Sequence, residues 1–445
     1  MPVFPEATRR RFLQGSAAVL GTGLLTGRAW PAENPRPKVA AVFTEFRFRS
    51  HAYNILINLL GPYLFRGQWI EPGAEVVSFY ADQFPDNDMA REVSRRFGIP
   101  IFKTIDEALC RGGKELAVDA VLIIGEHGEY PLSDLGVKMY PRKEFFDQSV
   151  AVMKRSKRFV PIFNDKHLSY RWDYAKAMYD EAREKGIPLM AGSSVPLAER
   201  RPAVEWPQDA VVEEAIAIHG GGMEVYDFHG FELLQSFIEA RRGGETGISR
   251  VQLVSGDAFR QAEREGRWSR ELANVAMSAE DDAEFERQPR PSANASVPEP
   301  PGEPHALLLS YKDGTKATVL KMGSTSNRWN FACRVRGQAK PLATAMFNGP
   351  WGNRNLFNAL TNAIIHFFQT GKPPYPVERT LLASGVLDVA MRSHHAGDKP
   401  LASPQLEIAY HSDDWRAYRE TGESWRIITP EIPQPTTFAP GPVSP

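Results

Sequence analysis

The chain has 445 residues, and its 53 lysines and arginines nearly balance its 54 aspartates and glutamates, for a formal net charge of −1. The hydrophobic content of 42% and the charged content of 24% are those of a globular protein, and the length predicts two or three domains. The balanced charge argues against broad attraction to nucleic acid or acidic lipid, so we expect no nucleic-acid partner. Two cysteines, Cys110 and Cys333, exclude a disulfide-built scaffold, and two buried free thiols are favoured over one disulfide.

The first 32 residues are predicted to be an export signal. The stretch TRRRFLQ at 8–14 resembles the twin-arginine signal pattern, with Gln14 where a lysine is usual. The apolar run at 17–25 is too short to span a bilayer and fits the hydrophobic region of a signal peptide. We therefore expect a periplasmic or otherwise exported protein that uses the twin-arginine machinery, with no membrane span after the signal is removed.

Residues 36–195 alternate between stretches typical of strands and stretches typical of helices. Apolar runs such as 118–125 are typical of buried parallel strands, and glycines such as Gly98 and Gly186 end the helical stretches. Repeated β-α units of this length predict a Rossmann-like, doubly wound parallel sheet. The expected strands and extended segments are 39–43, 74–81, 99–104, 118–125, 158–165 and 187–194, and the expected helices are 52–60, 87–98, 105–113, 143–157 and 171–186.

Residues 196–411 have a different pattern and are predicted to form an α+β substrate domain with an open mixed or antiparallel sheet. The clearest signal is a hairpin at 305–323 around a Lys-Asp-Gly turn. The acidic, proline-rich stretch at 278–304 is predicted to be a solvated loop, and the proline-rich tail at 412–445 is expected to wrap the surface or to be loose. Further strands are expected at 249–259, 330–338 and 341–347, and two helices are expected within 355–397.

The order of these elements resembles the Gfo/Idh/MocA oxidoreductase family. The stretches 97–131, 160–192 and 358–393 carry the likeness, which extends over about 38–402. The resemblance implies an N-terminal Rossmann domain followed by a C-terminal α/β domain. It also implies NAD or NADP as the cofactor and a carbohydrate as the substrate. A homo-oligomer that forms through the C-terminal sheet is a further expectation.

The turn after the first strand departs from the family pattern. The segment 44–51 has no glycine, whereas a G-x-G-x-x-G turn lets the backbone approach a pyrophosphate. Arg47 or Arg49 could meet a phosphate by its side chain instead. Asp82 ends the second strand and could hold a ribose hydroxyl, although the insertion at 60–73 separates it from the turn by more than is usual. The expected cofactor contacts are Thr44, Arg47, Arg49, Asp82, Glu126 and His127.

Polar residues follow two neighbouring strands of the predicted sheet and should face one crevice, because ligands lie at the carboxyl ends of parallel strands. Lys166 falls on the lysine of the family's Glu-Lys-Pro motif, so the resemblance implies a proton shuttle beside the reacting carbon. The alternative, without a functional role, is that these residues cap loops and carry surface charge. Besides Lys166, the expected substrate contacts here are Glu129, Asp165 and His167.

A glycine-rich turn at 220–222 precedes a helix that the resemblance places along the substrate pocket. It implies Asp227 and His229 as catalytic residues, with Glu232 one helical turn beyond as a substrate contact. A helix-capping aspartate and a core histidine are the alternative. Zinc-type Cys/His spacing and the H-E-x-x-H pattern do not occur in the sequence, so no metal site is predicted from spacing.

Three functions remain open from the sequence. The first is an exported NAD(P)-dependent oxidoreductase that takes a hydride from a ring carbon of a sugar or glycoside. The second is a cofactor-free or metal-dependent sugar lyase or epimerase on the same fold, and the third is a non-catalytic periplasmic carbohydrate-binding protein. The missing glycines favour the second and third, and the export signal and Lys166 favour the first.

Overall fold

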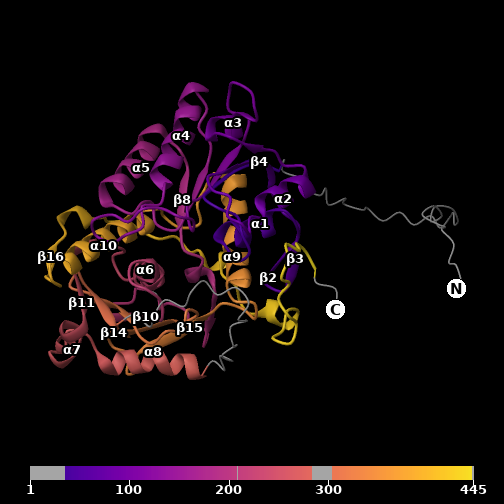
Figure 1. Cartoon of the computed structure of the whole chain (residues 1–445). Helices are drawn as coiled ribbons and strands as arrows, with labels where there is room; N and C mark the ends of the chain where they lie inside the picture. The colour runs from indigo at the N-terminus through magenta and orange to yellow at the C-terminus, as the bar shows by residue number, and fades with distance from the viewer. Residues whose placement is uncertain (1–35, 208, 283–302, 443–445) are drawn as a thin grey trace, which may run out of the picture. The chain divides into compact units, whose positions relative to one another are not determined.

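A six-stranded parallel sheet forms the first layer of the computed structural model (Figure 1), which describes residues 36–207, 209–282 and 303–442. Its strand order is β5-β4-β1-β6-β7-β8, the Rossmann order, in which successive strands are added on one side of β1 and then, from β6 on, on the other side. All five residues of β6 are buried, as the apolar run predicted. The strands are β1 (Lys38–Phe43), β4 (Glu75–Ala81), β5 (Ile101–Phe102), β6 (Ala120–Ile124), β7 (Ile162–Asp165) and β8 (Leu189–Gly192).

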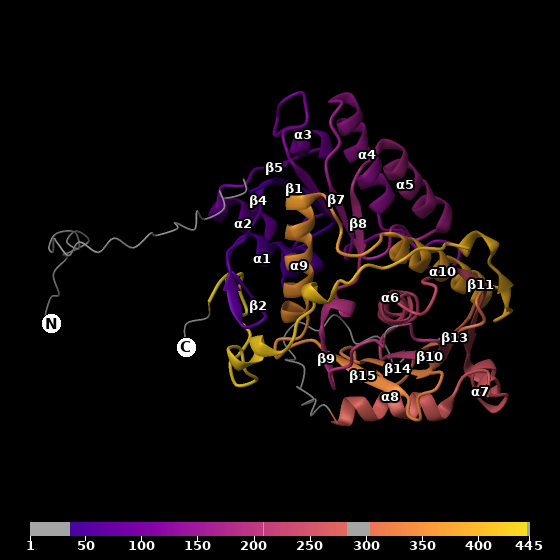
Figure 2. The ribbon, with the colours of Figure 1, turned by 180° about the vertical axis from the view of Figure 1, so that it is seen from behind.

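Helices cover this sheet in the expected alternation. Gly98 and Gly186 end their helices with φ values of 68° and 65°, in the left-handed region that a glycine adopts without strain. The helices α4 and α5 lie side by side in both views (Figures 1 and 2). The helices are α1 (His51–Leu59), α2 (Ala90–Phe97), α3 (Ile105–Cys110), α4 (Arg142–Arg155) and α5 (Trp172–Lys185).

The second sheet has eight strands in the order β16-β11-β12-β13-β10-β14-β15-β9, and only β10 and β13 pair in parallel. The expected mixed sheet and its hairpin, β12 to β13, are confirmed. The central strand β10 had no sequence prediction, because its acidic start, Glu213 and Glu214, interrupts the apolar pattern at the rim. The strands are β9 (Glu199–Arg201), β10 (Val212–His219), β11 (Ile248–Ser255), β12 (His305–Tyr311), β13 (Lys316–Lys321), β14 (Trp329–Val335), β15 (Leu342–Phe347) and β16 (Leu401–Ala402).

Helices lie on both faces of the second sheet. Helix α6 (Val225–Ile238) packs on the face toward the first sheet, and α8 (Arg270–Asp282) packs on the opposite face, below the strands in Figure 1. Two predictions are corrected here. The strand expected over 249–259 is confirmed as β11 up to Ser255, and its last four residues, 256–259, belong instead to α7 (Gly256–Arg264). Residues 278–282 of the expected loop 278–304 belong to α8. Residues 283–302 of that loop lie outside the described part of the chain.

The last part of the chain returns to the first sheet. Helix α9 (Asn353–Thr370) contacts α1, beside which it stands in Figure 2, and α10 (Glu378–His395) contacts α5 and α6. Through α10, the last part of the chain therefore contacts helices of both sheet layers. The predicted domain boundaries after residues 195 and 411 stay predictions. Short 3₁₀ turns are Val195–Leu197, Pro404–Leu406, Arg416–Tyr418 and Glu423–Arg426.

The described tail, through residue 442, is packed rather than loose. Its Phe438 is 3% exposed and meets the rings of Phe46, Tyr53 and Phe97 edge-on. The insertion at 60–73 forms a small hairpin, β2 (Tyr63–Phe65) and β3 (Gln68–Ile70), against which other tail residues bind.

Both cysteines are buried free thiols, as expected. Across the described ranges, no helix is long and apolar enough to cross a bilayer. The predicted signal at 1–32 lies outside the described residues.

Candidate active site

Lys166 follows β7 in a turn with a φ of 65°. Such a φ is uncommon for a residue other than glycine, so the surrounding structure must hold it. The side chain of Asn164 contributes, because its Nδ2 donates to the backbone oxygen of His167 at 3.1 Å. The turn directs Lys166 across to the end of β6, where its Nζ lies 3.0 Å from the Oε1 of Glu126.

Glu126 joins Lys166 to Arg142, the first residue of α4. The Nη2 of Arg142 donates to the Oε2 of Glu126 at 2.6 Å, and all three side chains are almost fully buried. Burial raises the pKa of Glu126, but the charges of Lys166 and Arg142 outweigh burial and hold it well below the usual value. The carboxylate is therefore ionised, and it offsets two buried cations.

His167 and Glu224 extend this cluster toward α6. The Nη1 of Arg142 lies 3.1 Å from the Nε2 of His167, and a guanidinium can only donate, so that nitrogen accepts. Burial, and then the charge of Arg142, lower the pKa of His167 well below its usual value. Glu224 lies 3.5 Å from the same nitrogen, and burial raises its pKa to about 7. Sequence reasoning missed Arg142 and Glu224, although a charged residue beside a glycine-rich turn was a usable signal.

His127 lies at the end of β6 with a φ of 70°. Burial, and then the charge of His51, lower its pKa to about 3, so its ring is neutral. Its Nε2 is buried and has no hydrogen-bond partner among the described residues. Thr44 links this end of β6 to β1, because its hydroxyl donates to the backbone oxygen of Glu126 at 2.6 Å.

Asp165 pairs with a residue that the sequence analysis did not select. The Nδ1 of His51, at the start of α1, lies 2.6 Å from the Oδ2 of Asp165, and both side chains are largely buried. Asp165, which was predicted to contact the substrate, thus pairs with a histidine of the protein. Nothing local in the sequence signals this pair, because the start of α1 and the end of β7 are brought together only by the tertiary fold.

His229 lies against the end of β8. The backbone N of Val195 donates to the Oγ of Ser193 at 3.1 Å, and that hydroxyl lies 2.6 Å from the Nδ1 of His229. Burial, and then the charge of Lys166, lower the pKa of His229 well below its usual value. The neutral ring and the hydroxyl therefore share one hydrogen bond at Nδ1, which leaves Nε2 of His229 for another partner.

Glu232 lies near the end of β8, and its carboxylate accepts hydrogen bonds from other residues of the protein. It accepts from the backbone N of Ser193 at 2.9 Å and from the hydroxyl of Thr380 at 2.6 Å. It is fully buried, and burial raises its pKa to about 7. Its contacts make it a support for the His229 partner, and a direct substrate contact stays a prediction.

Asp227 faces two histidines of the second sheet. Its Oδ1 accepts from the Nε2 of His219 at 3.0 Å and from the Nε2 of His305 at 2.9 Å, and its Oδ2 accepts from the backbone N of Glu224 at 2.8 Å. Burial raises its pKa, but the two histidines outweigh burial and lower it. The trio has the spacing of a metal site. The carboxylate of Asp227 is already bound by both histidines. Lys321 pairs in register with His219 on one side and with His305 on the other, and its positive charge disfavours a cation here.

The remaining predicted contacts lie toward the rim. The Nε of Arg47 pairs with the Oε1 of Glu45 at 2.5 Å, and Arg49 donates to the side chain of Gln434 at 2.7 Å. The carboxylate of Asp82 accepts from the hydroxyls of Tyr80 and Tyr130, at 2.9 and 2.6 Å, and Glu129 meets Gln83 through its backbone. These residues frame the edge where β1, β4 and β6 end, and their binding roles stay predictions.

The turn after β1 is filled by an aromatic side chain. Phe46 is fully buried and packs edge-on against Phe43 and Phe438. Ser50 caps α1 by accepting from the backbone N of Tyr53. A buried ring and a serine cap thus occupy the place of the missing glycines.

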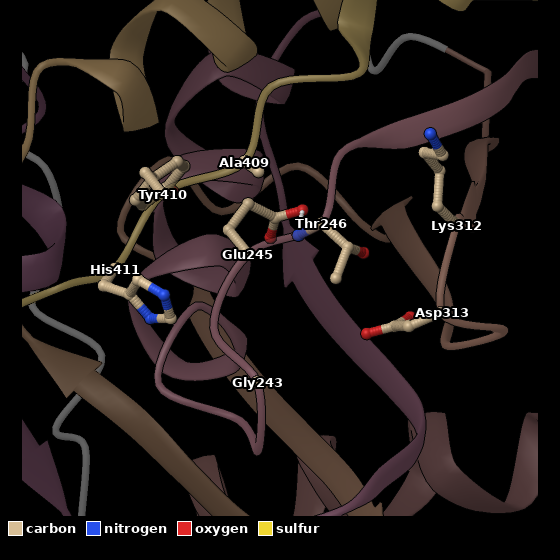
Figure 3. Close-up of a pocket in the computed structure, with 8 residues that line it drawn as sticks. All are labelled: Gly243, Glu245, Thr246, Lys312, Asp313, Ala409, Tyr410 and His411. Atoms are coloured by element: carbon tan, nitrogen blue, oxygen red, sulfur yellow. Dashed lines mark hydrogen bonds between the residues drawn. The ribbon is translucent and has the colours of Figure 1, made fainter.

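A hollow of about 490 Å³ lies away from this cluster (Figure 3). Its Glu245 is already bound by Arg241 and by the backbone N of Thr246 and Gly247. Because this carboxylate is already used within the protein, we assign the hollow a structural role. Its lining is Gly243, Glu245, Thr246, Lys312, Asp313, Ala409, Tyr410 and His411.

Solved structures share this fold, although no family model and no curated protein sequence matches the chain. The myo-inositol dehydrogenase of Lactobacillus casei, solved with NAD(H) and myo-inositol, is similar with a TM-score of 0.52 and 15% identity over 86% of this chain and 99% of that chain. GenD2 from gentamicin A biosynthesis, solved with NAD, is similar with a TM-score of 0.50 and 13% identity over 83% and 96%. The chain therefore has the Gfo/Idh/MocA fold, and the resemblance seen in the sequence is confirmed for the fold.

Proposed function

We propose that this protein is a Gfo/Idh/MocA-type oxidoreductase that interconverts a hydroxyl and a carbonyl on a sugar or polyol with NAD or NADP. The observation that carries the proposal is Lys166, which Glu126 holds at the carboxyl ends of β6 and β7. Open α/β sheets bind their ligands at this edge. The Lactobacillus casei relative supports the substrate class, because it was solved with NAD(H) and myo-inositol.

The residues at the point where the strand order reverses fit a dinucleotide, but its phosphates would be bound differently than by a glycine-rich turn. The buried Nε2 of His127, which has no partner in the described part of the chain, can serve a hydroxyl or an amide there. The buried ring of Phe46 fills the space that glycines leave open in such turns. Arg47 and Arg49 follow Phe46 in the same turn and offer guanidinium groups in place of backbone amides.

The bound nicotinamide would accept or supply the hydride, and the residues of the chain would stabilise the reacting oxygen. Lys166 is an ammonium donor, since its partner Glu126 is ionised. The Nε2 of His229 is left for the substrate, since the hydroxyl of Ser193 occupies its Nδ1. A charged donor in a buried site, such as Lys166, stabilises an oxygen that gains negative charge in the transition state.

The cofactor-free sugar lyase or epimerase remains the second candidate, because the aromatic side chain of Phe46 fills the turn. It would use the same polar cluster without a dinucleotide.

The deciding experiment is to purify the full chain without added nucleotide, denature it, and measure the released dinucleotide by absorbance and mass. We expect about one NAD(H) or NADP(H) per chain, or binding of added NAD(P) by calorimetry. An empty protein that also shows no heat of binding would contradict the redox function and leave the second candidate. The variant Lys166→Met is the matched control, since it should keep the dinucleotide and lose turnover.

We also propose export through the twin-arginine route, which residues 8–14 support. Replacing Arg9 and Arg10 by lysine should retain the protein in the cytoplasm of an expressing bacterium. Cell fractionation would measure this, and unchanged export of the double variant would contradict the proposal. A homo-oligomer through the second sheet stays a prediction. Because α8 covers the sheet face opposite α6, such an oligomer would have to use the outer side of α8.

A further inference from the structure

His51 begins α1 at the carboxyl edge of the first sheet, and its ring meets the end of β7. Its Nδ1 lies 2.6 Å from the Oδ2 of Asp165, the last residue of that strand. Ser50 already caps the helix, so the pair is not needed for capping. The pair ties the turn after β1 to the residue directly before Lys166.

Two neighbouring rings hold the plane of this imidazole. The rings of Phe357, from α9, and of His127 lie edge-on to it, with centroid distances of 4.8 and 5.3 Å. His51 is 8% exposed, whereas Asp165 is 1% exposed. The accessible part of the pair is thus the histidine, and the carboxylate lies behind it.

Among the acceptors at this edge, His51 is the accessible one, because it is 8% exposed, whereas the unpartnered Nε2 of His127 is buried. An ionised carboxylate only accepts, so Asp165 requires the proton of a neutral His51 on Nδ1 and a lone pair on Nε2. Lys166 is a donor, as described above. Lys166 and Arg142 take the two oxygens of Glu126.

We propose that His51 is a catalytic acid–base residue of this site and that Asp165 is its positioning residue, an assignment that rests on the proposed oxidoreductase function for its substrate. In oxidation, the substrate O–H bond breaks and its proton goes to the Nε2 of His51. The adjacent C–H bond breaks, its hydrogen leaves with the electron pair as hydride to NAD(P)⁺, and the carbon–oxygen double bond forms. In reduction, His51 returns the proton, and Asp165 stabilises the cationic ring in between.

The charges that face His51 suit a proton carrier. Asp165 from β7 and the ionised Glu126 from β6 favour a cationic ring, and Lys166 opposes it. His127 and His229 are neutral, because burial lowers the pKa of each. Phe357 contributes only an apolar surface from α9. The ring can therefore hold a proton without forming an unpaired buried charge.

The test replaces only the proposed proton acceptor. In His51→Asn the amide nitrogen can stand near the position of Nδ1 and donate to Asp165, but no atom replaces Nε2. We expect kcat for polyol oxidation to fall about 100-fold or more, with a smaller change in KM, unchanged dinucleotide content and loss of the acidic limb of the pH profile. Turnover within about threefold of the natural protein would overturn the assignment.

His394→Asn is the matched control. His394 also places its Nδ1 against a carboxylate, Asp398, at 2.8 Å, but it lies at the end of α10. Its substitution should leave kcat unchanged. An equal loss in both variants would mean that a histidine–aspartate pair acts here through folding alone, which would also overturn the assignment.

A second measurement does not need turnover. Nitrogen-15 histidine NMR of the natural protein, assigned with His51→Asn, should show a neutral His51 protonated on Nδ1, and Asp165→Asn should move that proton to Nε2. A natural ring protonated on Nε2 would overturn the assignment even if no polyol is turned over. Absence of bound dinucleotide, by contrast, would count against the proposed function and leave this readout in place.

Discussion

The Nζ of Lys166 lies 3.0 Å from the Oε1 of Glu126, across the ends of two adjacent parallel strands. Arg142 holds the other carboxylate oxygen at 2.6 Å, so one ionised side chain balances two buried cations. Lys166 can therefore be held at the strand edge without an unpaired charge in the interior. The same contact orients the ammonium that we propose to act on the substrate oxygen.

Glu126→Gln should destabilise the protein by about 3–5 kcal/mol, because it leaves Lys166 and Arg142 without their buried counter-charge. Urea unfolding measures the change. Asp106→Asn is the control, since its ion pair with Arg155 is half exposed and should contribute less than about 1 kcal/mol. Equal effects of the two substitutions would contradict the role of Glu126.

Glu232 should make stability depend on pH. Its folded pKa of about 7 is above its usual value of 4.5, so between these values the folded state binds a proton that the unfolded state lacks. The free energy of unfolding of the natural protein, relative to Glu232→Gln, should therefore fall as pH rises from about 4.5 to about 7, by up to about 1.4 kcal/mol per pH unit. Paired urea titrations across this range measure the difference, and a flat or rising difference would contradict burial as the cause.

Phe438→Ala should cost about 3–5 kcal/mol, because it empties a buried site among Phe46, Tyr53 and Phe97. Thermal or urea unfolding measures the loss. Ile427, 40% exposed in the same tail, provides the control substitution to alanine, which should cost less than about 1 kcal/mol. A negligible cost for Phe438→Ala would mean that the tail is not part of the fold.

Arg49→Ala should weaken the binding of NAD(P) by about 10-fold or more, if a side chain replaces the glycine amides at the phosphates. Its present hydrogen bond, to the side-chain oxygen of Gln434, lies at the surface and can be given up for a phosphate. Calorimetry measures the dissociation constant. Arg91→Ala is the control, since Arg91 lies over the ring of Phe84 on the surface, and an equal loss there would point to a general charge effect.

Treatment with a chelator should leave the melting temperature unchanged, because Asp227 is already satisfied by His219 and His305. Asp227→Ala should destabilise the protein by several kcal/mol, since it leaves two buried donors without their acceptor. Differential scanning calorimetry measures both. A melting temperature that falls with chelator and recovers with a divalent metal would show that the trio holds an ion.

Much of the fold was predictable from local patterns. The strands and helices of the first sheet follow from apolar runs and terminal glycines, and the second sheet was recognisable from its hairpin. The prediction failed at β10, whose acidic start hides a central strand. It also failed at residues 278–282, where an acidic composition continues a helix. In both places tertiary packing overrode local composition.

The sequence by itself determined the order of the elements and the strand ends at which polar residues gather, because both depend on neighbours in the chain. It selected Lys166, Glu126 and His229 from their places after strands and a glycine-rich turn. Only the tertiary structure decided which of these side chains meet. His51 reaches Asp165 across 114 positions of the chain, since the start of α1 and the end of β7 are brought together only by the tertiary fold. Contacts of this kind depend on strand order and helix packing, which the periodicity of one sequence does not encode.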